Sequence, residues 1–171
     1  LSVFALAACE RPDSDAPPAA ALVGWWKFDE GVGVTAADAS GNANTASLRS
    51  PGWGEGRSGG ALQMDGGNDN IASIPVSDSL RSAAREITVM GWTWRDADHN
   101  AAVVSHGYPA MFLGFHGLQF KWLVENVQNR KAACYADSKH RAETGRWYHL
   151  AGTWDGRTAR LYVDGEQICS K

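Results

Sequence analysis

The sequence predicts an all-β protein made of two antiparallel sheets, and three observations support this. From residue 22 onward, short apolar stretches alternate with Gly, Asn, Asp and Ser at spacings of about ten residues. No stretch keeps a helical period for more than about two turns. The chain contains 19 Gly and 8 Trp in 171 residues, a composition typical of β proteins rich in turns.

Each predicted strand is a short apolar or alternating run bounded by turn residues. One short helical segment is expected at 78–85, where the pattern departs from alternation. The predicted strands are 24–28, 45–48, 61–64, 71–74, 87–94, 102–105, 111–115, 118–124, 132–136, 147–154, 159–163 and 167–169.

The last three strands carry the strongest turn motifs. Asp155-Gly156 separates the first two of them and Asp164-Gly165 separates the next two. An Asp-Gly pair between alternating apolar runs is the best local indication of a hairpin, because both residues accept a positive φ. The chain reaches Lys171 directly after a strand, so we expect a sandwich that lacks its C-terminal strands.

The N-terminal residues are typical of a processed segment. Residues 1–8 are apolar and small, and Leu6-Ala7-Ala8-Cys9 matches the lipobox of bacterial lipoproteins. The alternative is an ordinary signal peptide with a chance cysteine. Residues 1–8 are therefore predicted to be a truncated signal peptide, Cys9 the lipidated residue and 9–21 a Pro/Ala-rich tether. This places the protein at the bacterial outer membrane or cell surface.

The other two cysteines form an even pair in an oxidising compartment. Cys134 and Cys169 are therefore predicted to form a disulfide. The alternative is a pair of buried thiols on separate strands.

The net charge of −3, with both signs interspersed, gives no basic surface for nucleic acid. Membrane attachment is expected only through the lipid anchor, because eight apolar residues are too few to span a bilayer.

Five segments in this order resemble the laminin G-like/concanavalin A-like lectin family. They include an opening Gly-Trp-Trp-Lys-Phe motif and a closing pair of Asp-Gly hairpins, and together they extend over nearly all of residues 22–171. The resemblance implies a jelly-roll domain that binds a carbohydrate or a cell-surface protein. The segments are 24–31, 37–44, 59–69, 87–92 and 145–165.

The resemblance also implies a structural Ca²⁺. The loop from Asp38 through Ser40 to Asn42 carries closely spaced oxygens, and Asp29 ends the neighbouring predicted strand. Hard cations bind six to eight such oxygens, so these four residues are the predicted ligands. The alternative is a loop of Asx turns without metal.

Catalysis is not expected. Glycoside hydrolases of the same fold need two carboxylates close together on one sheet face, whereas the closely spaced acidic pairs fall outside strands. The pairs Asp13/Asp15, Asp96/Asp98 and Asp164/Glu166 lie in the tether, a loop and a turn. An accessory domain of a glycan-degrading hydrolase or lyase, with its catalytic part elsewhere, is the alternative function. A structural spacer is a third hypothesis.

Aromatic side chains supply the candidate ligand site. Trp94, Tyr108 and Trp122 lie in the central stretch that resembles the family least, and they are predicted to line one sheet face. The alternative is scattered surface aromatics. The remaining strand tryptophans are predicted to pack in the core: Trp25, Trp92, Trp147 and Trp154.

Overall fold

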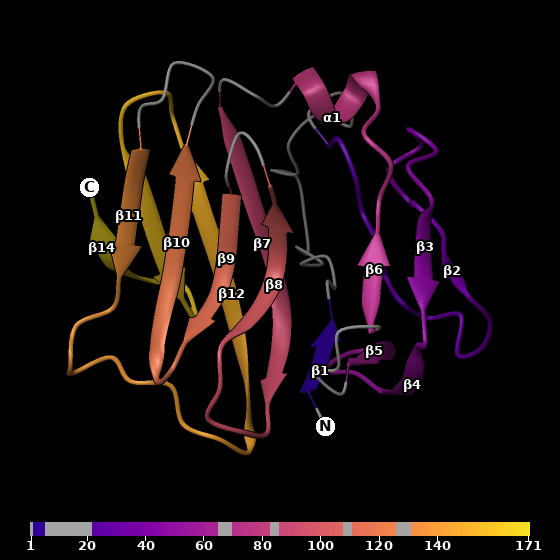
Figure 1. Ribbon diagram of the computed structural model, residues 1–171, viewed down its shortest axis with the longest axis horizontal. Helices are drawn as coiled ribbons and strands as arrows, with labels where there is room; N and C mark the ends of the chain where they lie inside the picture. Colours follow the sequence, from indigo (N-terminus) through magenta and orange to yellow (C-terminus); the bar gives the residue numbers. More distant parts are fainter. Residues whose placement is uncertain (1, 6–21, 65–69, 83–85, 108–110, 126–130) are drawn as a thin grey trace, which may run out of the picture. The chain divides into compact units, whose positions relative to one another are not determined.

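The computed structural model describes residues 2–5, 22–64, 70–82, 86–107, 111–125 and 131–171. The chain divides into two compact units, residues 1–83 and residues 84–171 (Figure 1). Cys9 and Tyr108 lie outside the described residues, so their predicted roles stay predictions.

Unit 1 consists of two small antiparallel sheets and a short helix, α1 (Asp78–Ser82). Its strands pair in the orders β1-β5-β4 and β2-β3-β6. In the described part of the chain, no helix is long and apolar enough to cross a membrane. The strands are β1 (Ser2–Ala5), β2 (Thr35–Ala36), β3 (Ala46–Arg49), β4 (Gly52–Glu55), β5 (Gly60–Met64) and β6 (Ile71–Ser73).

Two parts of unit 1 differ from the sequence prediction. The predicted strand 24–28 has no ladder and makes only an isolated bridge between Trp26 and Asp38, and Phe28 adopts a φ of 58°. Trp26 and Phe28 are nevertheless buried. The alternation of apolar residues along this segment therefore indicates which side chains are buried, and not that the backbone pairs in a sheet. Strand β4 was not predicted because its glycines are typical of a turn. It forms because its backbone pairs with β5.

Unit 2 is a sandwich of two antiparallel sheets, which confirms the predicted fold class (Figure 1). One sheet has the order β14-β13-β12-β7, and the other has the order β11-β10-β9-β8. The strands are β7 (Ile87–Arg95), β8 (Ala101–His106), β9 (Met111–His116), β10 (Gln119–Glu125), β11 (Lys131–Tyr135), β12 (Arg146–Trp154), β13 (Ala159–Val163) and β14 (Glu166–Ser170).

The core of unit 2 lies between these two sheets. On β12 every second side chain is buried, as expected for a strand that has one face against the core. The buried residues are Leu113, Phe115, Phe120, Trp122, Val124, Cys134, Ala136, Ala142, Tyr148, Leu150, Trp154, Ala159 and Leu161.

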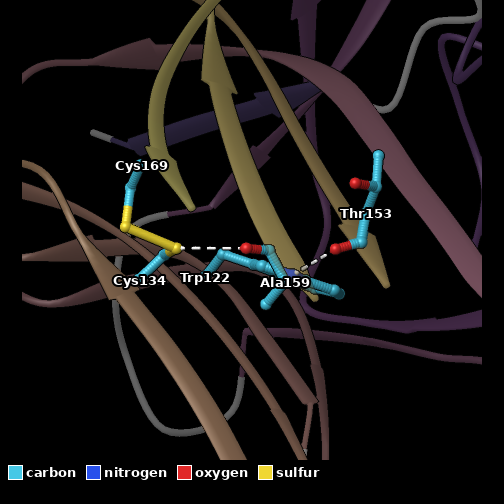
Figure 2. Close-up of a disulfide and its surroundings, with 5 residues drawn as sticks. All are labelled: Trp122, Cys134, Thr153, Ala159 and Cys169. Carbon is cyan, nitrogen blue, oxygen red and sulfur yellow. Dashed lines mark hydrogen bonds between the residues drawn. A yellow bond between two sulfur atoms is a disulfide. The ribbon is translucent and has the colours of Figure 1, made fainter. Parts of the chain in front are cut away.

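Trp122 lies at the centre of this core, with 0% of its surface exposed. Its indole Nε1 donates a 3.0 Å hydrogen bond to the carbonyl oxygen of Thr153 on the opposite sheet (Figure 2). Gly152 leaves room for the ring, because a Cβ there would lie 2.4 Å from the indole Cδ2 atom. A fully buried ring cannot stack on a ligand, so Trp122 is corrected from a predicted binding residue to a core residue.

A disulfide joins the two sheets of unit 2. Cys134 on β11 is bonded to Cys169 on β14, with Cα atoms 5.7 Å apart (Figure 2). The Cys134 sulfur is buried and lies 3.5 Å from the carbonyl oxygen of Ala159. The pair that the sequence predicts is therefore the pair that the structure links across the core.

A buried arginine lies at the end of β7, near the turn between β9 and β10. The Arg95 side chain is 3% exposed, and its guanidinium stacks 4.7 Å from the Phe115 ring centroid. One of its nitrogens donates to Asp98 at 2.9 Å and to the Gly117 carbonyl at 3.0 Å. Burial lowers the pKa of Arg95, opposed mainly by the negative charge of Asp98. The guanidinium therefore ties the 96–100 loop to the β9–β10 hairpin.

Candidate functional site

The outer face of β7 and β12 carries a ladder of large side chains. Met90, Trp92 and Trp94 alternate with core residues on β7, and Trp147 and His149 do the same on β12. The antiparallel register places Trp94 opposite Trp147 and Trp92 opposite His149. These five residues are called the Trp face below.

The rings of the Trp face pack edge to face. The centroids of Trp94 and Trp147 are 5.8 Å apart with an interplanar angle of 66°. The centroids of Trp92 and His149 are 5.2 Å apart at 63°. The three indoles are partly exposed, and Met90 is 41% exposed. This geometry holds each ring in place while it leaves aromatic surface open to solvent.

The surroundings of the His149 imidazole disfavour its charged form. Burial lowers its pKa below 6.5, and the negative charge of Asp164 only partly opposes this effect. Its Nε2 is buried and has no hydrogen-bond partner. A carboxylate oxygen of Asp164 accepts a 2.8 Å bond from the His149 backbone N–H, so the charge is anchored beside the ring.

Polar side chains from β13 and β14 continue the same face. Ala151 on β12 pairs with Tyr162, whose hydroxyl donates to Gln167 at 3.2 Å. The Arg160 guanidinium donates to Asp155 at 2.7 Å, and this bond helps to hold the pKa of Asp155 at about 2. Aromatic surface bordered by hydroxyl, amide and charged groups can bind a ligand that is apolar on its faces and polar at its edges.

The calcium-candidate loop is organised by Asp38. Its Oδ1 accepts hydrogen bonds from the backbone N–H groups of Trp25 and Ser40, and its Oδ2 accepts one from Asn44, each at 2.9 Å. Partial burial raises the pKa of Asp38, but hydrogen bonds from Ser40, Trp25 and Asn44 outweigh it and leave the pKa below 3.8. Asp38 thus stabilises its own loop at Ser40 and Asn44 and joins it to the backbone at Trp25.

The other candidate ligands also have hydrogen-bond partners. The Ser40 hydroxyl oxygen lies 3.3 Å from the Asn42 backbone nitrogen and accepts from it. The Asn42 amide group donates to the Leu22 carbonyl at 2.9 Å. Asp29 binds elsewhere, since its Oδ1 accepts the Gly60 N–H at 2.7 Å. The structure therefore gathers Asp38, Ser40 and Asn42 in one loop without Asp29.

This arrangement does not fit a bound calcium ion as it stands. Oxygens of Asp38 and Ser40 accept N–H donors, and Asn42 turns its NH₂ group toward backbone carbonyls that a cation would need. In the described residues, no group of three or more His, Cys, Asp or Glu side chains could hold a metal. Calcium binding stays a prediction that requires this loop to rearrange.

Replacing Asp38 separates the two roles of the loop. We expect Asp38→Ala to reduce the free energy of unfolding by about 2 kcal/mol in chelator, because three backbone donors lose their acceptor. Calcium binding would add a rise in melting temperature with Ca²⁺ in the parent but not in the variant. Thermal melts with EGTA and with Ca²⁺ measure both effects. If the parent protein melts at the same temperature with Ca²⁺ and with EGTA, the prediction of calcium binding is wrong. If Asp38→Ala melts at the same temperature as the parent in EGTA, the hydrogen bonds of Asp38 do not stabilise the fold.

Sequence reasoning placed Trp94 on a sheet face but assigned Trp92 and Trp147 to the core. The structure places both on the outer face, outside the buried cluster. The i, i+2 spacing of Met90, Trp92 and Trp94 does show that the three share one face. Which of the two faces meets the core depends on packing against the β8–β11 sheet, and the spacing along β7 carries no information about that packing.

Comparisons with known proteins agree with this architecture. Residues 65–171, more than half of the chain, match the family model described as the concanavalin A-like lectin/glucanases superfamily. No curated protein matches the chain. The crystal structure of the binding domain of Paraclostridial Mosquitocidal Protein 1 is similar, with a TM-score of 0.65 and 13% identity.

At that identity the similarity concerns the fold alone. The alignment covers 85% of this chain and 41% of the mosquitocidal domain, so the chain spans less than half of that structure. The family match and the two-sheet sandwich lead to the same conclusion. The chain belongs to the concanavalin A-like lectin/glucanases superfamily.

Proposed function

We propose that this protein is a non-catalytic binding module that recognises carbohydrate through the Trp face. The observation that carries the proposal is the register that pairs Trp94 with Trp147 and Trp92 with His149 on the outer side of the sheet. Pyranose rings have apolar C–H faces and polar edges. They therefore match indole faces on a sheet whose next strands carry the polar groups of Tyr162 and Gln167.

Two further features support a binding role. The superfamily includes lectins as well as glucanases. The similar structure is described as a binding domain, which supports the proposal that this protein binds some ligand. We also propose that the lipobox at Leu6-Ala7-Ala8-Cys9 attaches the module to the outer membrane, where extracellular glycans are accessible.

A role as accessory domain of a glycan-degrading enzyme uses the same face. A module that binds the polymer would raise the local concentration of a linked catalytic part. The Trp face supports a separate binding module and an accessory domain equally, because binding of the polymer does not depend on what the module is attached to.

The proposal is tested with neutral polysaccharides. The purified protein is run in native affinity gels that contain xyloglucan, laminarin or galactomannan, and the polymer that retards it is then titrated calorimetrically. We expect Trp94→Ala or Trp147→Ala to weaken binding by about tenfold or more, since one lost aromatic contact is worth about 1.4 kcal/mol. Trp94→Phe should keep part of the affinity because a ring remains.

Tyr135→Ala is the matched control. Tyr135 is 42% exposed on the other sheet of the same sandwich, so its loss removes an aromatic ring without touching the Trp face. Circular dichroism and melting curves establish that each variant is folded. Retention that survives both Trp variants, or that is lost in Tyr135→Ala, would refute the assignment to the Trp face. Failure of all three neutral polymers to retard the parent would count against neutral glycan recognition.

A further inference from the structure

The second sheet of unit 2 has its own outer face, which carries a cation among aromatic rings. On this face, Lys121 of β10 lies opposite Tyr135 of β11 and opposite Gly114 of β9. Phe112 and His116 flank Gly114 on β9 with the same orientation, because strand side chains alternate. We call Phe112, His116, Lys121 and Tyr135 the Lys121 face.

The ammonium of Lys121 is held by aromatic rings. Its Nζ lies 5.0 Å from the centroid of Phe112 and 5.3 Å from that of Tyr135. In the part of the chain that the structure describes, no carboxylate pairs with it. The positive charge is thus positioned by cation–π contacts and available to an incoming anion.

The neighbouring positions leave this charge accessible. Gly114 lies beside Lys121 and has no side chain that could cover the ammonium. No larger residue fits at this position, because a Cβ there would lie 2.1 Å from the Ala101 carbonyl oxygen. Tyr135 is 42% exposed, and the His116 ring stands nearly perpendicular to it at 6.0 Å. A ligand can therefore reach both the ammonium and the ring surfaces.

We propose that the Lys121 face binds the uronic acid residues of an acidic polysaccharide. A uronate has a carboxylate attached directly to a pyranose ring. The carboxylate can form a charge-assisted hydrogen bond with the Lys121 ammonium. The C–H face of the same ring can then pack on Tyr135 or Phe112. One acid group beside one flat apolar surface matches this arrangement of one ammonium between two rings.

Charge complementarity favours an anionic occupant over a neutral one. Lys121 and Lys131 are basic, and Glu125, the one carboxylate among the described residues of β8–β11, pairs in register with Lys131. A peptide strand is a poorer candidate, since strand addition uses the edge of a sheet rather than its face. This site is separate from the Trp face, so it does not depend on the proposed recognition of neutral glycans.

The test compares polygalacturonate with its fully methyl-esterified form, which has the same rings without the charge. We expect the parent protein to bind polygalacturonate at least tenfold more tightly than the ester in calorimetric titrations. Lys121→Gln should remove most of this difference, and Tyr135→Ala should weaken binding of the acidic polymer by about fivefold. In Trp94→Ala the preference for the acid over the ester should persist, because the Trp face does not include Lys121.

Lys131→Gln is the control for general electrostatic attraction. It removes one exposed positive charge from the neighbouring strand β11 and leaves the two ring contacts of Lys121 intact. Equal losses in Lys121→Gln and Lys131→Gln would overturn the site, as would equal binding of the acid and the ester. Tighter binding of dextran sulfate, which carries sulfate groups but no uronate, than of polygalacturonate would overturn the uronate assignment in favour of a sulfated ligand. Loss of the preference for the acid over the ester in Trp94→Ala would assign the acidic polymer to the Trp face instead.

Discussion

The double variant Cys134→Ala/Cys169→Ala is expected to lose about 4 kcal/mol of unfolding free energy. The bond closes a loop with a sequence separation of 35 residues and crosses from β11 to β14, on opposite sheets of the sandwich. Without it, the unfolded chain regains the entropy of that loop. β14 is also an edge strand, which pairs only with β13 within unit 2. Without the disulfide, β14 is held by this one neighbour, so the edge of the sheet becomes less stable.

Urea denaturation followed by tryptophan fluorescence measures this effect, with and without reductant. The reduced parent protein should approach the stability of the double variant. Cys9→Ala is the control, because it removes a cysteine that is not part of the disulfide. A double variant within about 1 kcal/mol of the parent would show that the sheets hold together without the covalent link.

Gly152→Ala is expected to be nearly as harmful, at about 3 kcal/mol. The added Cβ would lie 2.4 to 2.8 Å from three atoms of the Trp122 indole, which is itself fully buried and bonded to Thr153. The ring cannot move away without leaving its hydrogen bond and its packing. Removing the ring by Trp122→Ala should cost about 4 kcal/mol through the cavity that it leaves.

A double-mutant cycle attributes the cost to this contact. In a Trp122→Leu background the smaller side chain leaves room for the methyl group, so Gly152→Ala should cost less than about 1 kcal/mol. Gly107→Ala is the control glycine, since nothing lies within 4 Å of a Cβ at that position. Equal costs of Gly152→Ala in both backgrounds would contradict the overlap with Trp122.

The C-terminal hairpins are the part of the fold that local sequence predicted best. The Asp-Gly pairs at 155 and 164 separate β12, β13 and β14 as expected, and Asp164 itself adopts a φ of 50°. Hairpin turns are chosen by one or two residues with positive φ, so a short motif is sufficient. The irregular register between Leu161 and Tyr162 has no such motif and was not predicted.

The N-terminal unit shows where such reasoning fails. Trp26 and Phe28 alternate and are buried, yet their segment forms no ladder, whereas the glycine-rich β4 does. Burial depends on side chains, but ladder formation depends on a partner backbone at the right distance. The second condition is met by segments distant in sequence and leaves no local pattern.

The sequence by itself determined the all-β class, most strand positions and the hairpins, because alternation and turn chemistry are local properties. It predicted the cysteine pair from cysteine count alone, and the structure decided between a disulfide and two buried thiols. The tertiary structure decided which face of each strand is buried. In the structure, Trp122 is buried in the core, whereas Trp92 and Trp147 lie on the outer face of their sheet. Lys121 lies between Phe112 and Tyr135. A strand pattern specifies two faces equally well, and only packing against another sheet distinguishes the core side from the binding side.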